Sequence, residues 1–128
     1  MNRRHSLGDL QLAIMRVIWA RGEASVSEVH RALLSDRGLA PTTIATMLLK
    51  MERKGVVAHY VDGRKFIYRA IISEVQVRQG MVAELTERLF GGDTSALVAH
   101  LLAENRPTAA DLDEINQLIA QHDSEGKA

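Results

Sequence analysis

The sequence predicts a mostly helical protein with one small β-hairpin, and three observations lead to this fold class. Apolar residues recur at helical spacing over most of the 128-residue chain. Between residues 56 and 69 they alternate instead, as in a strand. The chain has no net charge, yet the part up to Ile71 carries twelve basic and six acidic residues, and the rest carries four and ten. We therefore expect two parts, residues 1–71 and residues 72–128.

Two helices are expected at the start of the first part. The first follows Gly8 and ends before Gly22, with apolar residues on one side. The second begins at a capping box, in which Ser25 and Glu28 each accept a hydrogen bond from the other's backbone. Val29, Ala32 and Leu33 would form its buried stripe, and Gly38 would end it.

A third helix should begin at Pro41, a residue favoured at the first helical position, and end at Gly55. Its apolar side carries Ile44, Met47, Leu48 and Met51. The opposite side carries Thr42, Thr46, Leu49 and Arg53, with Thr43 and Lys50 at its flank. Such a face, rich in threonine and cations and nearly free of acid, is unusual for a helix that only meets solvent.

The hairpin comes next. Alternating residues from Val56 to Val61 and from Lys65 to Arg69 predict two strands, joined by a turn at Asp62-Gly63. Arg64 and Lys65 would lie at its tip. Three helices followed by a basic-tipped hairpin is the order of a winged helix-turn-helix.

The second part predicts three further helices. One is capped by Ser73 and ends at Gly91-Gly92, one follows Asp93 or Thr94, and one is capped by Thr108. We expect the tail after Gln121 to be frayed.

About fifty residues in three helices cannot bury a core of their own. Their surplus apolar surface must meet either the winged helix or a second copy of the chain, and we favour a second copy. The residues expected to form this helical dimerisation region are Met81, Val82, Leu85, Leu89, Leu97, Leu101, Leu112, Ile115, Leu118 and Ile119.

The pattern of the third helix suits double-stranded DNA. A recognition helix enters the major groove with its N-terminal residues on base edges, which assigns Thr42, Thr43 and Thr46 to base contacts. Leu49 would meet a thymine methyl or, equally well, pack beneath the hairpin. The remaining candidates are Lys50 and Arg53 for phosphate or guanine, Arg64 and Lys65 for the backbone or minor groove, and Ser25 for a phosphate at a helix N-terminus.

These residues also carry a family resemblance. The chain resembles the penicillinase and methicillin-resistance repressor family in the run from Leu7 to Trp19, in Ser27 to Val29, and in Pro41 to Leu48. The likeness continues through Lys54-Gly55, Gly63-Arg64, Tyr68, Leu89 to Gly92, and Ala96 to Val98. It covers roughly residues 7 to 120.

The resemblance implies a homodimeric transcriptional repressor of resistance or stress genes that binds a palindromic operator. It also implies release through a sensor-protease pathway, with cleavage in the dimerisation region. The family's usual Asn-Phe pair corresponds here to His100-Leu101, which is the candidate cleavage position and a departure from the pattern. Thr42 stands where relatives often carry a cation, and the C-terminal cysteines of copper-responsive relatives are absent here.

Other classes fit the sequence less well. The five histidines are scattered, no cysteine is present, and neither a phosphate-binding glycine loop nor a nucleophile elbow occurs, so we expect no enzyme, metal or cofactor. No apolar run is long enough to span a bilayer and no secretory signal is recognisable, so we expect a cytoplasmic protein without membrane insertion. Two alternatives stay open: a winged-helix module that docks proteins, and a ligand-sensing regulator of another winged-helix family.

Overall fold

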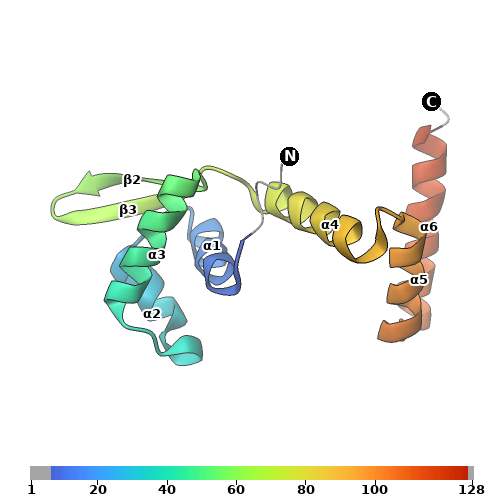
Figure 1. Ribbon diagram of the computed structural model, residues 1–128, viewed down its shortest axis with the longest axis horizontal. Helices are drawn as coiled ribbons and strands as arrows, with labels where there is room; N and C mark the ends of the chain where they lie inside the picture. Colours follow the sequence, from blue (N-terminus) through green and yellow to red (C-terminus); the bar gives the residue numbers. More distant parts are fainter. Residues whose placement is uncertain (1–6, 127–128) are drawn as a thin grey trace. The chain divides into compact units, whose positions relative to one another are not determined.

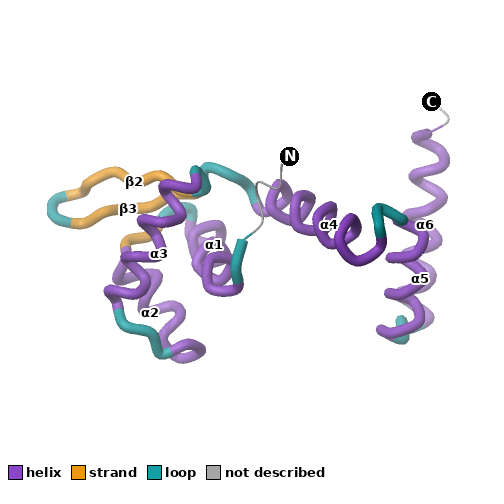
Figure 2. The backbone as a smooth tube through the Cα atoms, viewed as in Figure 1, coloured by secondary structure: helices purple, strands orange, loops and turns teal. Residues whose placement is uncertain are grey.

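The computed structural model describes residues 7–126, which contain six helices and three short strands. Figure 1 shows the elements in sequence colours, and Figure 2 distinguishes helices, strands and loops. In order they are α1 (Asp9–Arg21), β1 (Ala24–Ser25), α2 (Val26–Arg37), α3 (Pro41–Lys54), β2 (Val57–Asp62), β3 (Lys65–Ala70), α4 (Glu74–Phe90), α5 (Thr94–Asn105) and α6 (Ala109–Gly126). The expected fold class, mostly helical with a small hairpin, is confirmed.

Local signals set the ends of α2 and α3. The backbone N–H of Ser25 donates to Glu28 Oε1 over 2.8 Å, and the N–H of Glu28 donates to Ser25 Oγ over 3.2 Å, so the capping box is formed. Pro41 is the first residue of α3. Gly55 ends that helix in the left-handed region at φ 87°, a backbone conformation that glycine adopts without a steric penalty.

The sheet differs from expectation in two ways. Asp62 pairs with Lys65, so the hairpin turn is Gly63-Arg64, and the expected turn at Asp62-Gly63 is wrong by one residue. Gly63 has φ 65°, and glycine with a positive φ at the first central position is typical of a II′ hairpin turn. The second difference is an extra strand: β1 pairs antiparallel with β3, which gives the order β1-β3-β2.

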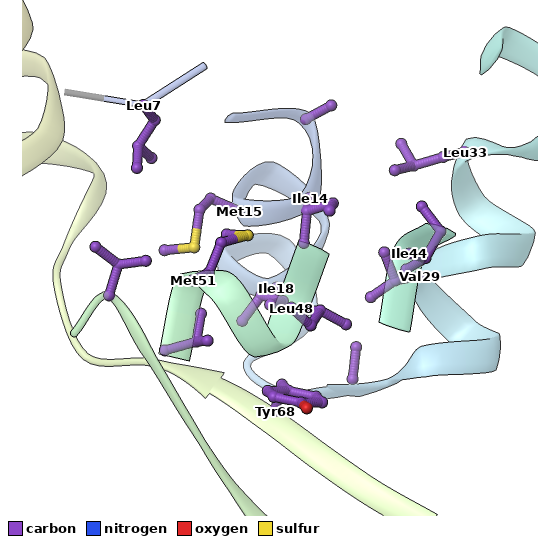
Figure 3. Packing of buried hydrophobic residues seen from close by; sticks show 14 of the residues in the cluster. Leu7, Ile14, Met15, Ile18, Val29, Leu33, Ile44, Leu48, Met51 and Tyr68 are labelled. Atoms are coloured by element: carbon purple, nitrogen blue, oxygen red, sulfur yellow. The ribbon is translucent and has the colours of Figure 1, made fainter. Parts of the chain in front are cut away.

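One apolar core joins α1, α2, α3 and the sheet (Figure 3). Figure 3 shows side chains of α1, α2 and α3 converging above the ring of Tyr68, which is 1% exposed. From α3, Ile44, Leu48 and Met51 are buried as expected. Ala32 is exposed, contrary to expectation, because the buried side of α2 centres on Val29 and Leu33.

The first part of α4 belongs to the same core. Ile72 and Val77 are buried in it, and Trp19 Nε1 donates to the carbonyl oxygen of Ile72 over 3.0 Å. The compact unit therefore extends to Leu85, and a second unit begins at Thr86. The sequence analysis placed the boundary earlier, after Ile71. The apolar pattern of the helix that follows does not indicate that α4 contributes to this core.

The second unit contains the end of α4 together with α5 and α6. Asp93 caps α5 by accepting the N–H of Ala96 over 3.0 Å, and Thr108 caps α6 through a reciprocal pair with Asp111. The helix α6 continues to Gly126, beyond the point at which we expected fraying. Within residues 7–126, no side chain of α5 or α6 is buried.

The side chains expected to pair between subunits fall into two groups. Met81, Leu97 and Ile115 are half-buried, and Met81 packs against the core of the first unit. The others are exposed: Val82, Leu85, Leu89, Leu101, Leu112, Leu118 and Ile119. Among the described residues, no helix has both the length and the apolar character needed to cross a lipid bilayer.

Candidate nucleic-acid interface

The helix α3 has one side in the core and one side in solvent. Its outer face, as we call it below, consists of Thr42, Thr43, Thr46, Leu49, Lys50 and Arg53, and all six are exposed. Leu49 is 42% exposed and is therefore not packed beneath the hairpin. Because the inner side is anchored by buried residues, the outer face is held rigidly outward.

The N-terminal end of this helix is electropositive. Its first turn contains no acidic residue, and its N-cap, Ala40, has no side chain that could accept a hydrogen bond from the helix. A helix N-terminus carries a partial positive charge, which an acidic cap would offset. The three threonines of the outer face lie at or near this end, so hydroxyl groups and positive potential occur together.

The exposed cations of the outer face and of the hairpin turn have no ion-pair partner among the described residues. Within residues 7–126, Lys50, Arg53, Arg64 and Lys65 form no salt bridge, whereas ion pairs occur elsewhere as Arg21–Glu28, Arg37–Asp9 and Arg78–Glu74. A cation that is not paired internally can neutralise a phosphate without first giving up a protein contact. The unpaired charges therefore mark α3 and the hairpin as the surface suited to a polyanion.

The hairpin, or wing, carries its basic residues at the turn. Arg64 lies in the two-residue turn and Lys65 begins β3, and both are exposed. Val61 and Phe66 pair just behind the turn and are also exposed, at 58% and 41%.

The wing contacts α3 through His59, whose ring is also stacked within the wing. His59 Nδ1 lies 2.7 and 3.0 Å from the two carboxylate oxygens of Glu52. The His59 ring stacks on Phe66 with centroids 4.1 Å apart and an interplanar angle of 10°. Burial raises the pKa of Tyr68, and the nearby charge of Glu52 raises it further.

A second tie holds the opposite side of the same strand. The hydroxyl of Tyr60 donates to Glu23 Oε2 over 2.8 Å, and this hydrogen bond is the largest cause of the raised pKa of Tyr60. Glu23 lies between α1 and β1, so this tie does not involve α3.

Ser25 lies apart from the outer face. It is only 4% exposed, and its hydroxyl already accepts the N–H of Glu28. Ser27, two residues later, is exposed at the same helix end, and the sequence interpretation passed over it. The capping box could have indicated Ser27 instead of Ser25, because the hydroxyl of a cap serine is already hydrogen-bonded to the backbone of its own helix. Among the described residues, no cluster of three metal-ligating side chains occurs.

Comparison with known proteins agrees with this geometry. The sequence profile of the penicillinase repressor family matches residues 7–121, which is most of the chain. The protein belongs to the penicillinase repressor family. This confirms the family resemblance that the sequence motifs between Leu7 and Val98 indicated.

Relatives of this penicillinase repressor family member are similar along nearly their whole length. The penicillinase repressor of Bacillus licheniformis is 27% identical over 127 residues, covering 99% of each chain. The transcriptional regulator BlaI of Mycobacterium tuberculosis is 32% identical over 117 residues, covering 90% of this chain and 83% of its own. Among solved structures, the DNA-binding domain of the repressor BlaI matches with a TM-score of 0.51 and 35% identity, over 58% of this chain and 90% of that domain.

Proposed function

We propose that this protein is a DNA-binding transcriptional repressor whose α3 enters the major groove of its operator. The observation that carries the proposal is the outer face of α3, which combines exposed threonines with cations that have no partner within residues 7–126. Membership of a repressor family supports it. The proposed activity is binding alone, in the cytoplasm, with no catalytic step.

Each group on the interface has a chemical role in this proposal. Threonine hydroxyls at 42, 43 and 46 donate to or accept from base edges, and Leu49 contacts a thymine methyl. Lys50 and Arg53 bind phosphate or guanine. Arg64 and Lys65 contact the backbone or minor groove beside the same site, and they position the protein more than they specify sequence.

We further propose that two copies bind together at a palindromic operator. The support is the apolar surface of the second unit, where a groove runs between α5 and α6. Leu101, Leu102, Ile115 and Leu118 form its apolar lining, and polar side chains lie at its edge. Contiguous exposed apolar surface of this kind is typical of a site where another protein surface binds. Two linked copies bind two half-sites far more tightly than either copy binds one, because the second contact becomes intramolecular.

Release by proteolysis remains part of the proposal. The candidate pair His100-Leu101 lies within α5, and the His100 ring is 5.8 Å from that of Phe90. A peptide bond inside a helix must leave the helical conformation before a protease can hold it in an extended form. The proposed signal therefore has to act on a locally opened α5.

The test begins with selection of bound sequences from random DNA, followed by fluorescence anisotropy titrations at several salt concentrations. Lys50→Ala should weaken binding to the selected operator by about tenfold and flatten the salt dependence by about one unit per subunit. Thr46→Ala should weaken binding at one base pair in each half-site while leaving the salt dependence unchanged. Both variants should melt like the wild type, since both side chains are exposed.

Arg78→Ala is the matched control, because it removes the same charge from α4, where the arginine is paired with Glu74. Its operator affinity should stay within about twofold of the wild type. Unchanged affinity in both the Lys50 and Thr46 variants would reject the groove assignment. A wild-type protein that ignores DNA at low salt would reject the function.

A further inference from the structure

The helix α3 contains a single acidic residue, Glu52, and the side chain of this residue contacts the wing. The two oxygens of its carboxylate lie 2.7 and 3.0 Å from His59 Nδ1 on β2. An ionised carboxylate only accepts hydrogen bonds, so Nδ1 carries the proton in this contact. The side chains are partly buried, with exposed fractions of 31% for Glu52 and 23% for His59. Partial burial makes the contact stronger than a pair in full solvent.

The imidazole of His59 is fixed on its other sides as well. Phe66 stacks on it at 4.1 Å, and Tyr68, buried in the core, lies 5.3 Å away at a tilted angle. In the hairpin register His59 is opposite Tyr68, and the next pair on the same face is Val61 and Phe66. The imidazole thus links α3, the core and the outer part of the wing.

Beyond this point the wing is exposed. Two cross-strand pairs, Val61 with Phe66 and Asp62 with Lys65, lie between His59 and the turn at Gly63-Arg64. All of these residues are exposed. Side-chain hydrogen bonds join β2 to residues outside the hairpin on both faces of the strand, from His59 to Glu52 on α3 and from Tyr60 to Glu23 on the opposite face. The first of these joins the wing to the helix that would read DNA.

We propose that Glu52 and His59 are positioning residues for DNA binding, which hold Arg64 at a fixed place relative to the outer face of α3. The inference rests on the proposed function and deepens it. Two contact points that are already in register lose less conformational entropy on binding than two that move independently. Breaking the pair would therefore remove the contribution of the wing while leaving the contacts of α3 in place.

The experiment is a double-mutant cycle in the full-length chain, with affinity for the selected operator as the measurement. In the wild-type background, Arg64→Ala should weaken binding by about tenfold and flatten the salt dependence by about one unit per subunit. In a His59→Ala background, the same substitution should change affinity by less than about twofold. The coupling expected between residues of one network is large enough to resolve this difference. Glu52→Gln, a milder change, should reduce the Arg64→Ala penalty in the same direction.

Tyr60→Phe provides the matched control. Tyr60 is the residue next to His59 on β2, and its hydroxyl donates to the carboxylate of Glu23 rather than to a residue of α3. The substitution removes this hydrogen bond. The Arg64→Ala penalty should remain about tenfold in that background. A role of His59 that is merely structural would lower the melting temperature and leave the penalty unchanged.

The outcomes separate the two proposals. Suppose that the wild type binds its operator and that Arg64→Ala weakens binding by the same factor in the His59→Ala and Glu52→Gln backgrounds as in the wild type. The positioning role is then overturned and the repressor function stands. If Tyr60→Phe abolishes the Arg64→Ala penalty as fully as His59→Ala does, the specific link to α3 is overturned. A wild type without salt-dependent DNA binding overturns both.

Discussion

Leu48 and Leu49 are neighbours in the chain with opposite environments. Leu48 has no exposed surface, whereas Leu49 is 42% exposed on the outer face of α3. Helical geometry separates consecutive side chains by about 100°, so one can lie in a core while the next meets solvent. Leu48 should therefore contribute to the stability of the protein, and Leu49, the next residue, to its binding of DNA.

Alanine substitution at these two leucines should have opposite consequences. Leu48→Ala leaves a cavity in the core and should lower the free energy of unfolding by about 2–5 kcal/mol. Leu49→Ala should change that free energy by less than about 1 kcal/mol, but it should reduce the preference for thymine at one position of the operator by about threefold to tenfold. Denaturant unfolding and competition titrations with single-base operator variants measure the two effects. A Leu49→Ala variant with full operator preference would show that its exposed side chain contacts no base.

At the scale of elements, the helix ends were the most predictable features. Ser25 with Glu28 starts α2 and Thr108 starts α6 through hydrogen bonds within a few residues. Pro41 starts α3 through its fixed backbone angle and Gly55 ends it in the left-handed region, so the local sequence suffices in each case. Outward placement of the α3 threonines followed from the helical period in the same way.

Features that depend on distant partners could not be predicted. The strand β1 has two residues and exists only because Ala24 and Ser25 pair with Tyr68 and Ile67 on β3. The hairpin turn shifted by one residue because Asp62 takes part in the strand register, which the Asp-Gly pair alone does not specify. The contact between Glu52 and His59 was missed for the same reason, since nothing local indicates that β2 returns to α3.

The cap of α2 predicts a pH dependence. The hydrogen bond from the backbone of Ser25 lowers the pKa of Glu28, and the charge of Arg21 lowers it further. A lowered pKa in the folded state means that the ionised carboxylate stabilises the fold above its ordinary pKa, and that this contribution is lost as the pH falls through the lowered value. The melting temperature of Glu28→Gln should therefore lie below that of the wild type at neutral pH and approach it in acid.

The control for this measurement is Asp36→Asn, which removes an exposed carboxylate near the other end of α2. Its melting temperature should follow that of the wild type across the same pH range. A constant difference between Glu28→Gln and the wild type from neutral to acid pH would contradict the assignment.

At the scale of the whole molecule, burial is unevenly distributed. The core lies in the first unit, whereas α5 and α6 have no buried side chain within the described residues. The apolar stripes of these helices were predictable from periodicity, but the end of the first unit at Leu85 was not, because the stripe of α4 does not indicate that Val77 belongs to the core of that unit. The proposed dimer accounts for the exposed stripes.

Replacing exposed apolar side chains of the second unit should separate the subunits. The double variant Leu101→Gln with Leu118→Gln should sediment as a monomer and bind its operator at least about a hundredfold more weakly, because one half-site no longer supports the other. Its first unit should unfold as in the wild type. Asn116→Ala, a polar position on α6, should remain a dimer with full affinity. A double variant that still sediments as a dimer would place the contact elsewhere.

The position of Leu101 has a kinetic consequence. Its side chain lines the groove between α5 and α6, and its backbone nitrogen belongs to the proposed cleavage bond between His100 and Leu101. A protease can cut there only during the fraction of time in which α5 is unwound, and a subunit seated on Leu101 would reduce that fraction. Dilution of the protein should therefore shorten its lifetime toward proteases, so that scarcity of the repressor would hasten its own removal.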